Sequence, residues 1–175
     1  MDTVETERLR IRPVQESDAA SIALLVTPSV SRWTATWPSE ISLEDAGNRI
    51  SSAIQARQTG LGISFAIETK TDGTLVGWIG LRRKEFDHKR WGLGYWIGEP
   101  FHGRGYMSEA GRAIIGLAWS LLDADVIEAA AQPGNAASIA ILRKLGMRFA
   151  GQKMIFAPVR NQDELCVLYE VFRPI

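Results

Sequence analysis

The stretch His102-Gly103-Arg104-Gly105-Tyr106-Met107 joins a predicted strand, Trp91 to Gly98, to a predicted helix, Met107 to Leu122. Two glycines leave the backbone of this turn bare, so a bulky anion can approach it closely. The first amides of the helix have no partners inside the helix and point into the same turn. The helix dipole adds an attraction for negative charge. The sequence therefore predicts a phosphate cradle between the strand and the helix.

The spacing of this turn does not match two common nucleotide motifs. The pattern Gly103-x-Gly105-x-x-Ser108 lacks the third glycine of the dinucleotide fingerprint. Asp123 and Asp125 precede the next predicted strand, whereas the fingerprint needs an acid at its end. A P-loop is absent from the sequence. A glycine turn that only connects a strand to a helix remains the alternative interpretation.

The composition fits one domain over residues 1–175. Twenty basic residues balance twenty acidic ones, so no basic surface for nucleic acid is expected. The single cysteine, Cys166, excludes an intrachain disulfide and a zinc site of paired cysteines, and its apolar neighbours predict a buried side chain. Residues 1–5 lack the pattern of a secretion signal, and the apolar helix Ala113 to Leu122 is too short to span a bilayer. We expect a cytoplasmic protein without a metal or a membrane partner.

Hydrophobic periodicity and cap residues predict the order strand, two helices, three strands, helix, strand, helix, two strands. The predicted strands are 8–12, 63–69, 75–82, 91–98, 126–131, 147–156 and 165–172. The predicted helices run from the cap Ser17-Asp18 to Thr27, from Ser42 to Gly60, from Met107 to Leu122, and from the cap Asn135 to Lys144. Residues 29–39 are predicted to be irregular. This order indicates a mixed α/β sheet with helices on both faces.

Several short motifs occur in the order and spacing of one known family. They are Thr6 to Arg12, Gly77 to Gly80, Gly94 to Ile97, Gly103 to Ala110, Asn135 to Ser138 and Leu145 to Met147. Together they make the sequence resemble the GNAT acetyltransferase superfamily, and within it the RimJ/RimL-like branch, over nearly the whole chain. The resemblance implies a single-domain, mostly antiparallel mixed sheet, flanked by helices on both faces and splayed between the strands near 91–98 and 126–131. It also implies acetyl transfer from acetyl-CoA to a primary amine.

The resemblance assigns the CoA site to one group of residues. In the family, the amides of Gly103 to Met107 hold the pyrophosphate and the pantetheine arm lies in the splay. The cofactor-binding residues that follow from this are Trp96, Ile97, Gly98, His102, Gly103, Arg104, Gly105, Tyr106, Met107 and Asn135. The amides of Trp96 to Gly98 are expected to stabilise the oxyanion if the strand bulges there. Asn135 is either a plain N-cap or a cap that also contacts the pantetheine arm.

Ser138 is the candidate acid that protonates the departing thiolate. It shares a helix face with Leu142 and Leu145, so its hydroxyl points partly toward the sheet. The alternative is a serine that satisfies a backbone group in the first helical turn. Trp33 and Trp37 lie in the segment that borders the acceptor in this branch, and the alternative for them is a lid over the core.

Three positions depart from the branch pattern. His102 stands where Gln or Arg is preferred, Met107 where Gly or Ala is usual, and Gly92 where many members carry a glutamate. Glu99 and Glu128 remain as possible bases. The Gly92 and Met107 departures keep a non-catalytic acyl-CoA sensor open as an alternative, beside a structural module that binds nothing. The sequence leaves the oligomeric state open, a homodimer included.

The missing glutamate at position 92 favours an acceptor that needs little help to lose its proton. At pH 7, about one α-amine in seven is neutral, against roughly one lysine in 2,500. We therefore expect the α-amino group of a peptide or protein N-terminus, with a small-molecule amine as the alternative.

Overall fold

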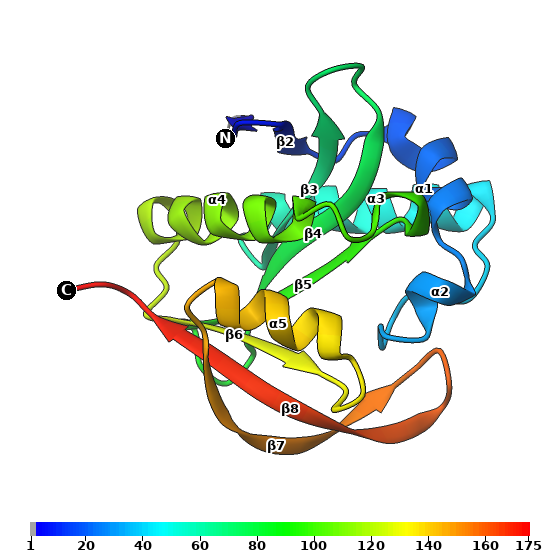
Figure 1. The fold of residues 1–175 in the computed structure, drawn as a ribbon. Helices are drawn as coiled ribbons and strands as arrows, with labels where there is room; N and C mark the ends of the chain where they lie inside the picture. The colour runs from blue at the N-terminus through cyan, green and yellow to red at the C-terminus, as the bar shows by residue number, and fades with distance from the viewer. Residues whose placement is uncertain (1–2) are drawn as a thin grey trace.

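The computed structural model describes residues 3–175, which form an eight-stranded sheet with helices on both faces (Figure 1). The strand order is β1-β2-β3-β4-β5-β6-β8-β7, and only the β5–β6 pair is parallel. The strands are β1 Val4–Glu5, β2 Leu9–Pro13, β3 Gly62–Thr69, β4 Leu75–Arg83, β5 Arg90–Ile97, β6 Val126–Ala131, β7 Arg148–Ala157 and β8 Gln162–Phe172. The α-helices are α1 Ala19–Leu25, α2 Pro28–Ser31, α3 Leu43–Gln58, α4 Tyr106–Leu121 and α5 Ala136–Lys144, with 3-10 turns at Glu16–Asp18 and Glu99–Phe101.

Each face of the sheet carries its own hydrophobic core. Helices α4 and α5 cover a cluster that includes Ile79, Ile114, Ile127 and Leu142. Helices α1 to α3 cover a second cluster on the opposite face, which includes Ile22, Ile50, Trp78 and Trp96. Side chains alternate between the faces along a strand. Strand β5 therefore sends Tyr95 and Ile97 toward α4 and α5, and Trp96 toward α3.

Strands β5 and β6 pair at one end only. Their register runs from Arg90 opposite Val126 to Gly92 opposite Glu128, and no later pair forms in the described chain. Beyond this point the two strands diverge, as Figure 1 shows. The predicted splay is thus confirmed. The unpaired region between residues 93–97 of β5 and the helix α5, which follows β6, is called the gap below.

The predicted strands and helices are largely confirmed, with three differences. β1 is too short to show a period in the sequence, and α2 falls in the segment predicted to be irregular, with Pro28 in its first turn. The three- and four-residue spacing of Met107, Ala110, Ile114, Leu117 and Leu121 predicts one buried stripe on α4, but Leu121 is 47% exposed. The prediction was wrong because α4 ends at Leu121, and the extended Leu122 packs on the core in its place.

Cap residues and the lone cysteine agree with the sequence analysis. The Ser42 hydroxyl accepts the Asp45 amide at 3.0 Å and begins α3. Cys166 is buried and free, as predicted.

Across residues 3–175, the structure contains no helix with the length and apolar character of a membrane span. In the same range, no three His, Cys, Asp or Glu side chains are grouped to hold a metal ion. Met1 and Asp2, which belong to the opening examined for a signal, lie outside the described residues.

Candidate functional site

The predicted cradle lies at the start of α4. Gly103 has φ +74° and Gly105 has φ +79°, a left-handed conformation that residues with a side chain rarely adopt. Gly105 is the N-cap of α4, so the unpartnered first amides of the helix follow it directly. The side chain of Met107 is buried in the core, so this residue can offer the cradle only its amide. The glycine pair and the helix N-terminus together fit a phosphate group.

The chain's N-terminal segment is attached to this cradle through Glu109. One carboxylate oxygen of Glu109 accepts the Thr6 hydroxyl at 2.5 Å and the Arg8 amide at 2.8 Å. The other oxygen accepts Nε of Arg8 at 2.7 Å. Burial alone would raise the pKa of Glu109, but the hydrogen bonds from Thr6 and Arg8 outweigh it and lower the pKa. Glu109 therefore holds residues 6–8 against the first turn of α4 as a carboxylate.

Arg8 borders the cradle, which the sequence analysis did not predict. Its Nη1 donates to the Arg104 carbonyl at 2.8 Å, and its guanidinium lies 4.9 Å from the centre of the Tyr106 ring. Its Nη2 lies 3.5 Å from the position that a Cβ on Gly105 would take. A guanidinium at this place can add a charge-assisted hydrogen bond to a phosphate in the cradle. Arg8 belongs to the motif Thr6 to Arg12, but its partners lie far along the sequence, so the motif alone could not predict the contact.

Glu109→Gln is expected to weaken CoA binding about three- to tenfold and to lower the free energy of unfolding by about 1–2 kcal/mol, because charge-assisted hydrogen bonds to Arg8 are lost. The lowered pKa makes the sign clear: the carboxylate stabilises the fold above its unfolded pKa, and this contribution is lost as the pH falls through the folded pKa. Urea unfolding below pH 4.5 should therefore separate wild type from variant less than at pH 7. Glu7→Gln, on an exposed neighbour, is the control. Equal CoA affinities for Glu109→Gln and Glu7→Gln would contradict the role.

His102 has a contact that the sequence analysis did not anticipate. Its Nε2 lies 2.7 Å from the Ile97 carbonyl oxygen, and because a carbonyl can only accept, Nε2 carries the proton. Nδ1 is then the ring nitrogen left for the predicted contact with a phosphate, and it can donate to one only when the imidazole carries a proton on both nitrogens. In this arrangement His102 connects the cradle to the end of β5.

The free amides at the gap are those of Tyr95 and Ile97. The Gly98 amide donates to the Val76 carbonyl at 2.9 Å, and β5 pairs with β4 up to Ile97 without a register shift. Because partners alternate in an antiparallel ladder, Trp96 also points its amide toward β4, whereas Tyr95 and Ile97 point theirs into the gap. The bulge on which the Trp96 and Gly98 amides depended is therefore not present, and this corrects their assignment as oxyanion donors. Ile97 stays a predicted oxyanion donor, because its amide points into the gap.

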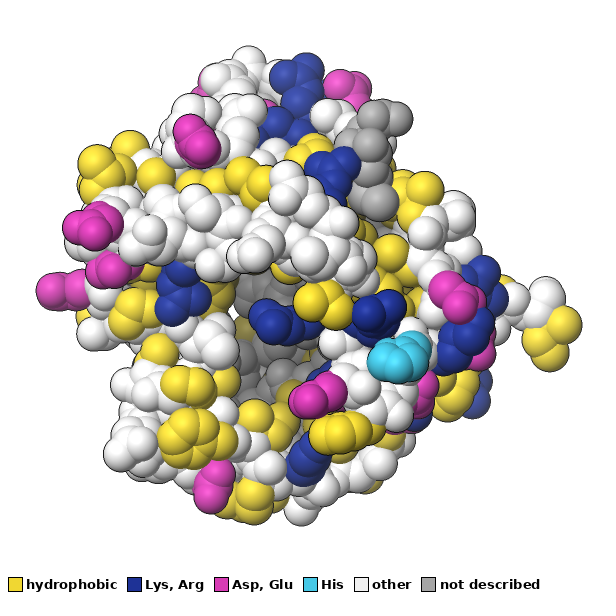
Figure 2. All heavy atoms as spheres, turned by 180° about the vertical axis from the view of Figure 1, so that it is seen from behind, with side chains coloured by type: hydrophobic (Ala, Val, Ile, Leu, Met, Phe, Trp, Pro, Cys, Tyr) yellow, Lys and Arg dark blue, Asp and Glu magenta, His cyan; other side chains and the backbone are white. Residues whose placement is uncertain are grey.

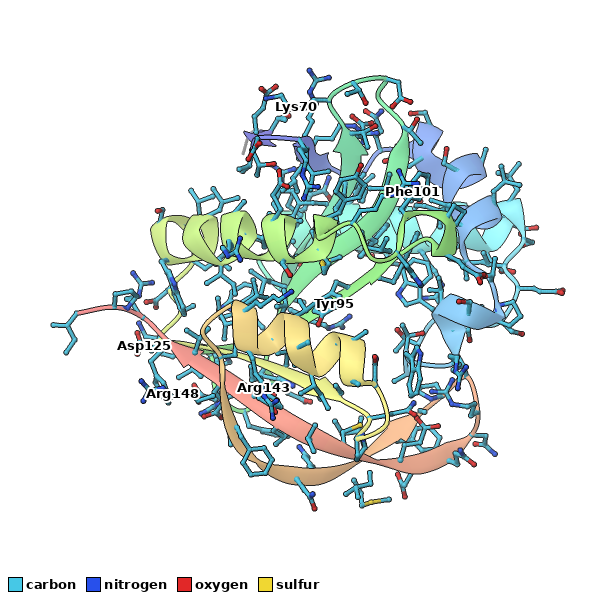
Figure 3. The ribbon with its side chains drawn as sticks, viewed as in Figure 1. Lys70, Tyr95, Phe101, Asp125, Arg143 and Arg148 are labelled. Atoms are coloured by element: carbon cyan, nitrogen blue, oxygen red, sulfur yellow. The ribbon has the colours of Figure 1, made fainter. Side chains whose placement is uncertain are left out.

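Ser138 faces the gap opposite Tyr95. The two hydroxyls are 2.7 Å apart and join α5 to β5, and Figure 3 shows Tyr95 between α4 and α5. Burial raises the pKa of Tyr95 to about 12, with the Ser138 contact acting in the opposite direction, so Tyr95 stays protonated at neutral pH. The Asn135 side chain accepts the Ser138 amide at 3.1 Å, which confirms Asn135 as the N-cap. Tyr95 was quoted in a sequence motif, but its contact with Ser138 was not predicted.

The two tryptophans of the acceptor prediction lie in different places. Trp37 packs edge-on against Trp78 and Trp96, with ring centres 5.3 and 5.4 Å away, and lines a cavity on the α3 face. Trp33 lies instead under its own neighbour Arg32, 3.6 Å from where a Cβ on Gly134 would be. Gly134 precedes α5, so Trp33 borders the far end of the gap.

The candidate bases differ in their surroundings. Glu128 forms ion pairs with Lys84 at 2.6 Å and Arg90 at 3.2 Å, so its carboxylate already faces two cations. Glu99 is exposed in the turn before the cradle. A Cβ on Gly92 would lie 3.2 Å from Cε of Lys84, so the lysine stem covers the position where the branch often has a glutamate.

The sequence matches the acetyltransferase (GNAT) domain family over residues 8–148. The N-acetyltransferase YoaA of Bacillus subtilis (strain 168), itself uncharacterized, is 31% identical over 150 residues, which are 85% of this chain and 84% of YoaA. The structure of RimL, a ribosomal L7/L12 alpha-N-protein acetyltransferase in complex with coenzyme A, has a TM-score of 0.86 at 19% identity and covers 98% of both chains. The microcin C7 self immunity acetyltransferase MccE, in complex with acetyl-CoA and AMP, has a TM-score of 0.82 at 16% identity, covering 95% of this chain and 93% of MccE.

Proposed function

The chain belongs to the GNAT acetyltransferase family and is an acetyl-CoA-dependent N-acetyltransferase, and we propose that its acceptor is the α-amino group of a peptide or protein N-terminus. The observation that carries the proposal is the gap between β5 and α5, which the Tyr95–Ser138 contact bridges beside the cradle of α4. It provides an anion site, free backbone amides and a hydroxyl in one place. The likeness to RimL, named for acetylating a protein α-amine, supports the choice of acceptor.

The residues fit the two ends of acetyl-CoA. The pyrophosphate suits the left-handed glycines Gly103 and Gly105 and the amides that follow, with Arg8 at the rim. The amide-containing pantetheine arm suits the outward-facing groups of Tyr95 and Ile97, which a strand partner would otherwise occupy. The thioester is then placed near Ser138.

The reaction forms one bond and breaks one. The amine nitrogen attacks the thioester carbonyl carbon, and the negative charge that develops on the carbonyl oxygen can be stabilised by an amide of the gap, that of Tyr95 or Ile97. When the carbon–sulfur bond breaks, the thiolate takes a proton from the Ser138 hydroxyl. The proton that the nitrogen loses passes through water to the Ser138 oxygen, so the serine hydroxyl is restored and the products are the acetylated amine and CoA.

Tyr95 acts as a positioning residue in this scheme. Either hydroxyl can donate in the 2.7 Å contact, and the scheme takes the phenol, which burial keeps protonated, as the donor. The serine hydrogen is then free to point toward the sulfur. A serine hydroxyl without this partner could rotate among several directions. In this scheme, the contact with Tyr95 is what allows a serine to serve as the acid.

The choice of acceptor follows from the surroundings of the candidate bases. Glu128 faces two cations and position 92 is glycine, so neither position offers a free carboxylate to deprotonate a strongly basic amine. An α-amine with a pKa of about 7.8 supplies its neutral form several hundred times more often at pH 7 than a lysine side chain. The α-amine therefore matches a site of this kind.

The test compares three groups of acceptors by release of free thiol from acetyl-CoA: peptides with a free N-terminus, peptides blocked there but bearing lysine, and small primary amines. We expect kcat/KM for free N-termini to exceed that for blocked lysine peptides at least 100-fold, because of the difference in neutral amine. Efficient turnover of blocked lysine peptides, with free N-termini ignored, would overturn the proposal. Turnover confined to small amines would replace the peptide acceptor by a small molecule.

A further inference from the structure

A cavity of about 530 Å³ opens on the face of the sheet opposite the cradle, beside α3. Its lining includes Trp37, Asp45, Arg49, Ser64, Trp78 and Arg82. Figure 2 shows the molecule from behind, where the surface is hollowed and Lys and Arg side chains border the hollow. One side of the cavity is thus aromatic, and another carries positive charge.

Ser64, which lines this cavity, begins a row of paired residues that crosses the sheet toward the gap. Ser64 on β3 lies opposite Gly80 on β4, and Gly80 lies opposite Gly94 on β5. These three residues form a row across the sheet with one small side chain and two glycines, and a Cβ on Gly94 would meet no atom within 4 Å. With strands about 4.8 Å apart, the row spans about 10 Å, which is the length of three extended residues. Its end at Gly94 adjoins Tyr95, whose amide faces the gap.

Arg82 is the uncommitted charge beside this row. It lies two residues after Gly80 on the same face of β4, and it is exposed. Within residues 3–175, which the structure describes, Arg82 makes no ion pair. The nearby cations differ: Lys84 is paired with Glu128, and Arg90 with Glu128 and Glu170. Two residues along a strand is about 6.6 Å, so Arg82 can reach a group near the middle of the row.

Arg49 adds a second cation that is fixed in place. Its guanidinium lies 4.5 Å from the centre of the Trp37 ring and donates to the Thr36 carbonyl. Burial lowers the pKa of Arg49, and the charge of Asp45 acts in the opposite direction. Asp45 is the acid on the cavity lining, and it accepts a hydrogen bond from Ser42. The lining therefore carries two arginines against one aspartate.

We propose that this cavity binds the first three residues of the acceptor and selects those with a carboxylate at the second or third residue, which Arg82 recognises. The inference rests on the proposed α-amine acceptor and adds its chemical class, an acidic N-terminal peptide. The α-amine lies over Gly94 at the gap, the chain extends over Gly80 and Ser64, and the acidic side chain turns toward Arg82. The Trp37 and Trp78 rings cover the apolar part of the same segment.

The test uses two matched heptapeptides with a free N-terminal alanine, one with Asp at positions 2 and 3 and one with Asn there. We expect wild type to prefer the Asp peptide in kcat/KM about tenfold, because one interfacial ion pair with Arg82 is made. Arg82→Glu should abolish or invert that preference. Arg83→Glu is the matched control, since Arg83 is adjacent on β4 but points to the opposite face.

Each outcome decides something. Equal rates for both peptides in wild type, or a preference that survives Arg82→Glu, would overturn the inference and leave the acetyl transfer to α-amines intact. If neither peptide is acetylated, calorimetry of each with the CoA-bound protein separates the two proposals. Asp-selective binding that Arg82→Glu removes would keep the cavity assignment while the acceptor proposal fails. Binding without selectivity, or none, would overturn both.

Discussion

Gly105→Val is expected to weaken CoA binding by about 100-fold or more. The residue has φ +79°, where a β-branched side chain is strained, and its Cβ would point toward Nη2 of Arg8. The substitution displaces the first amides of α4 and fills space meant for phosphate. Losing two hydrogen bonds to a charged group, at about 1.5–3 kcal/mol each, accounts for the size of the effect. Titration calorimetry with CoA measures it.

The control for Gly105→Val is Gly60→Val. Gly60 has φ +69° and, like Gly103, no atom within 4 Å of a built Cβ, but it lies after α3, away from the cradle. Gly60→Val therefore introduces similar backbone strain at a position that does not border the phosphate cradle. Undiminished CoA affinity in Gly105→Val, or an equal loss in Gly60→Val, would show that the pyrophosphate is bound elsewhere.

Ser138→Ala should lower kcat about 100-fold while the affinity for CoA stays within about twofold, because general acid catalysis contributes about 10²–10⁴ to rate and acts in the transition state. Tyr95→Phe should lower kcat about tenfold, since it removes only the partner that orients Ser138. Because burial raises the pKa of Tyr95 to about 12, ionisation of Tyr95 should cause no fall in kcat as the pH is raised from 7 toward that value.

A double-mutant cycle separates positioning from plain structure. In the Ser138→Ala background, Tyr95→Phe should have little further effect on kcat, because the hydroxyl that it orients is gone. Independent, multiplicative losses would mean that Tyr95 acts by another route. A loss confined to CoA affinity, with normal turnover at saturation, would make Ser138 a binding or capping residue.

The sequence was sufficient for the fold because its signals are local. Periodicity, the Ser42 and Asn135 caps and the glycine turn each act within a few residues, and they placed the main strands and helices. The splay came from family resemblance, and the pairing of β5 and β6, which stops at Gly92, agrees with it. Leu121 was placed in the buried stripe wrongly because the backbone becomes extended directly after it, and Leu122 packs on the core in its place.

Contacts between distant segments could not be read from the sequence. The bonds from Thr6 and Arg8 to Glu109 join residues about a hundred positions apart, and Tyr95 meets Ser138 across the gap. The choice of free amides also needed the register of β4 and β5. The Gly98 amide was an expected oxyanion donor, but in the sheet it donates to the Val76 carbonyl.

The most direct test of the central claim is a single peptide with both a free N-terminus and an internal lysine, incubated with the protein and acetyl-CoA. Fragmentation mass spectrometry then localises the added acetyl group. We predict acetylation of the N-terminal nitrogen, slowed about 100-fold in Ser138→Ala, with the lysine unmodified over the same time. An acetyl group found on the lysine while the N-terminus stays free would contradict the account.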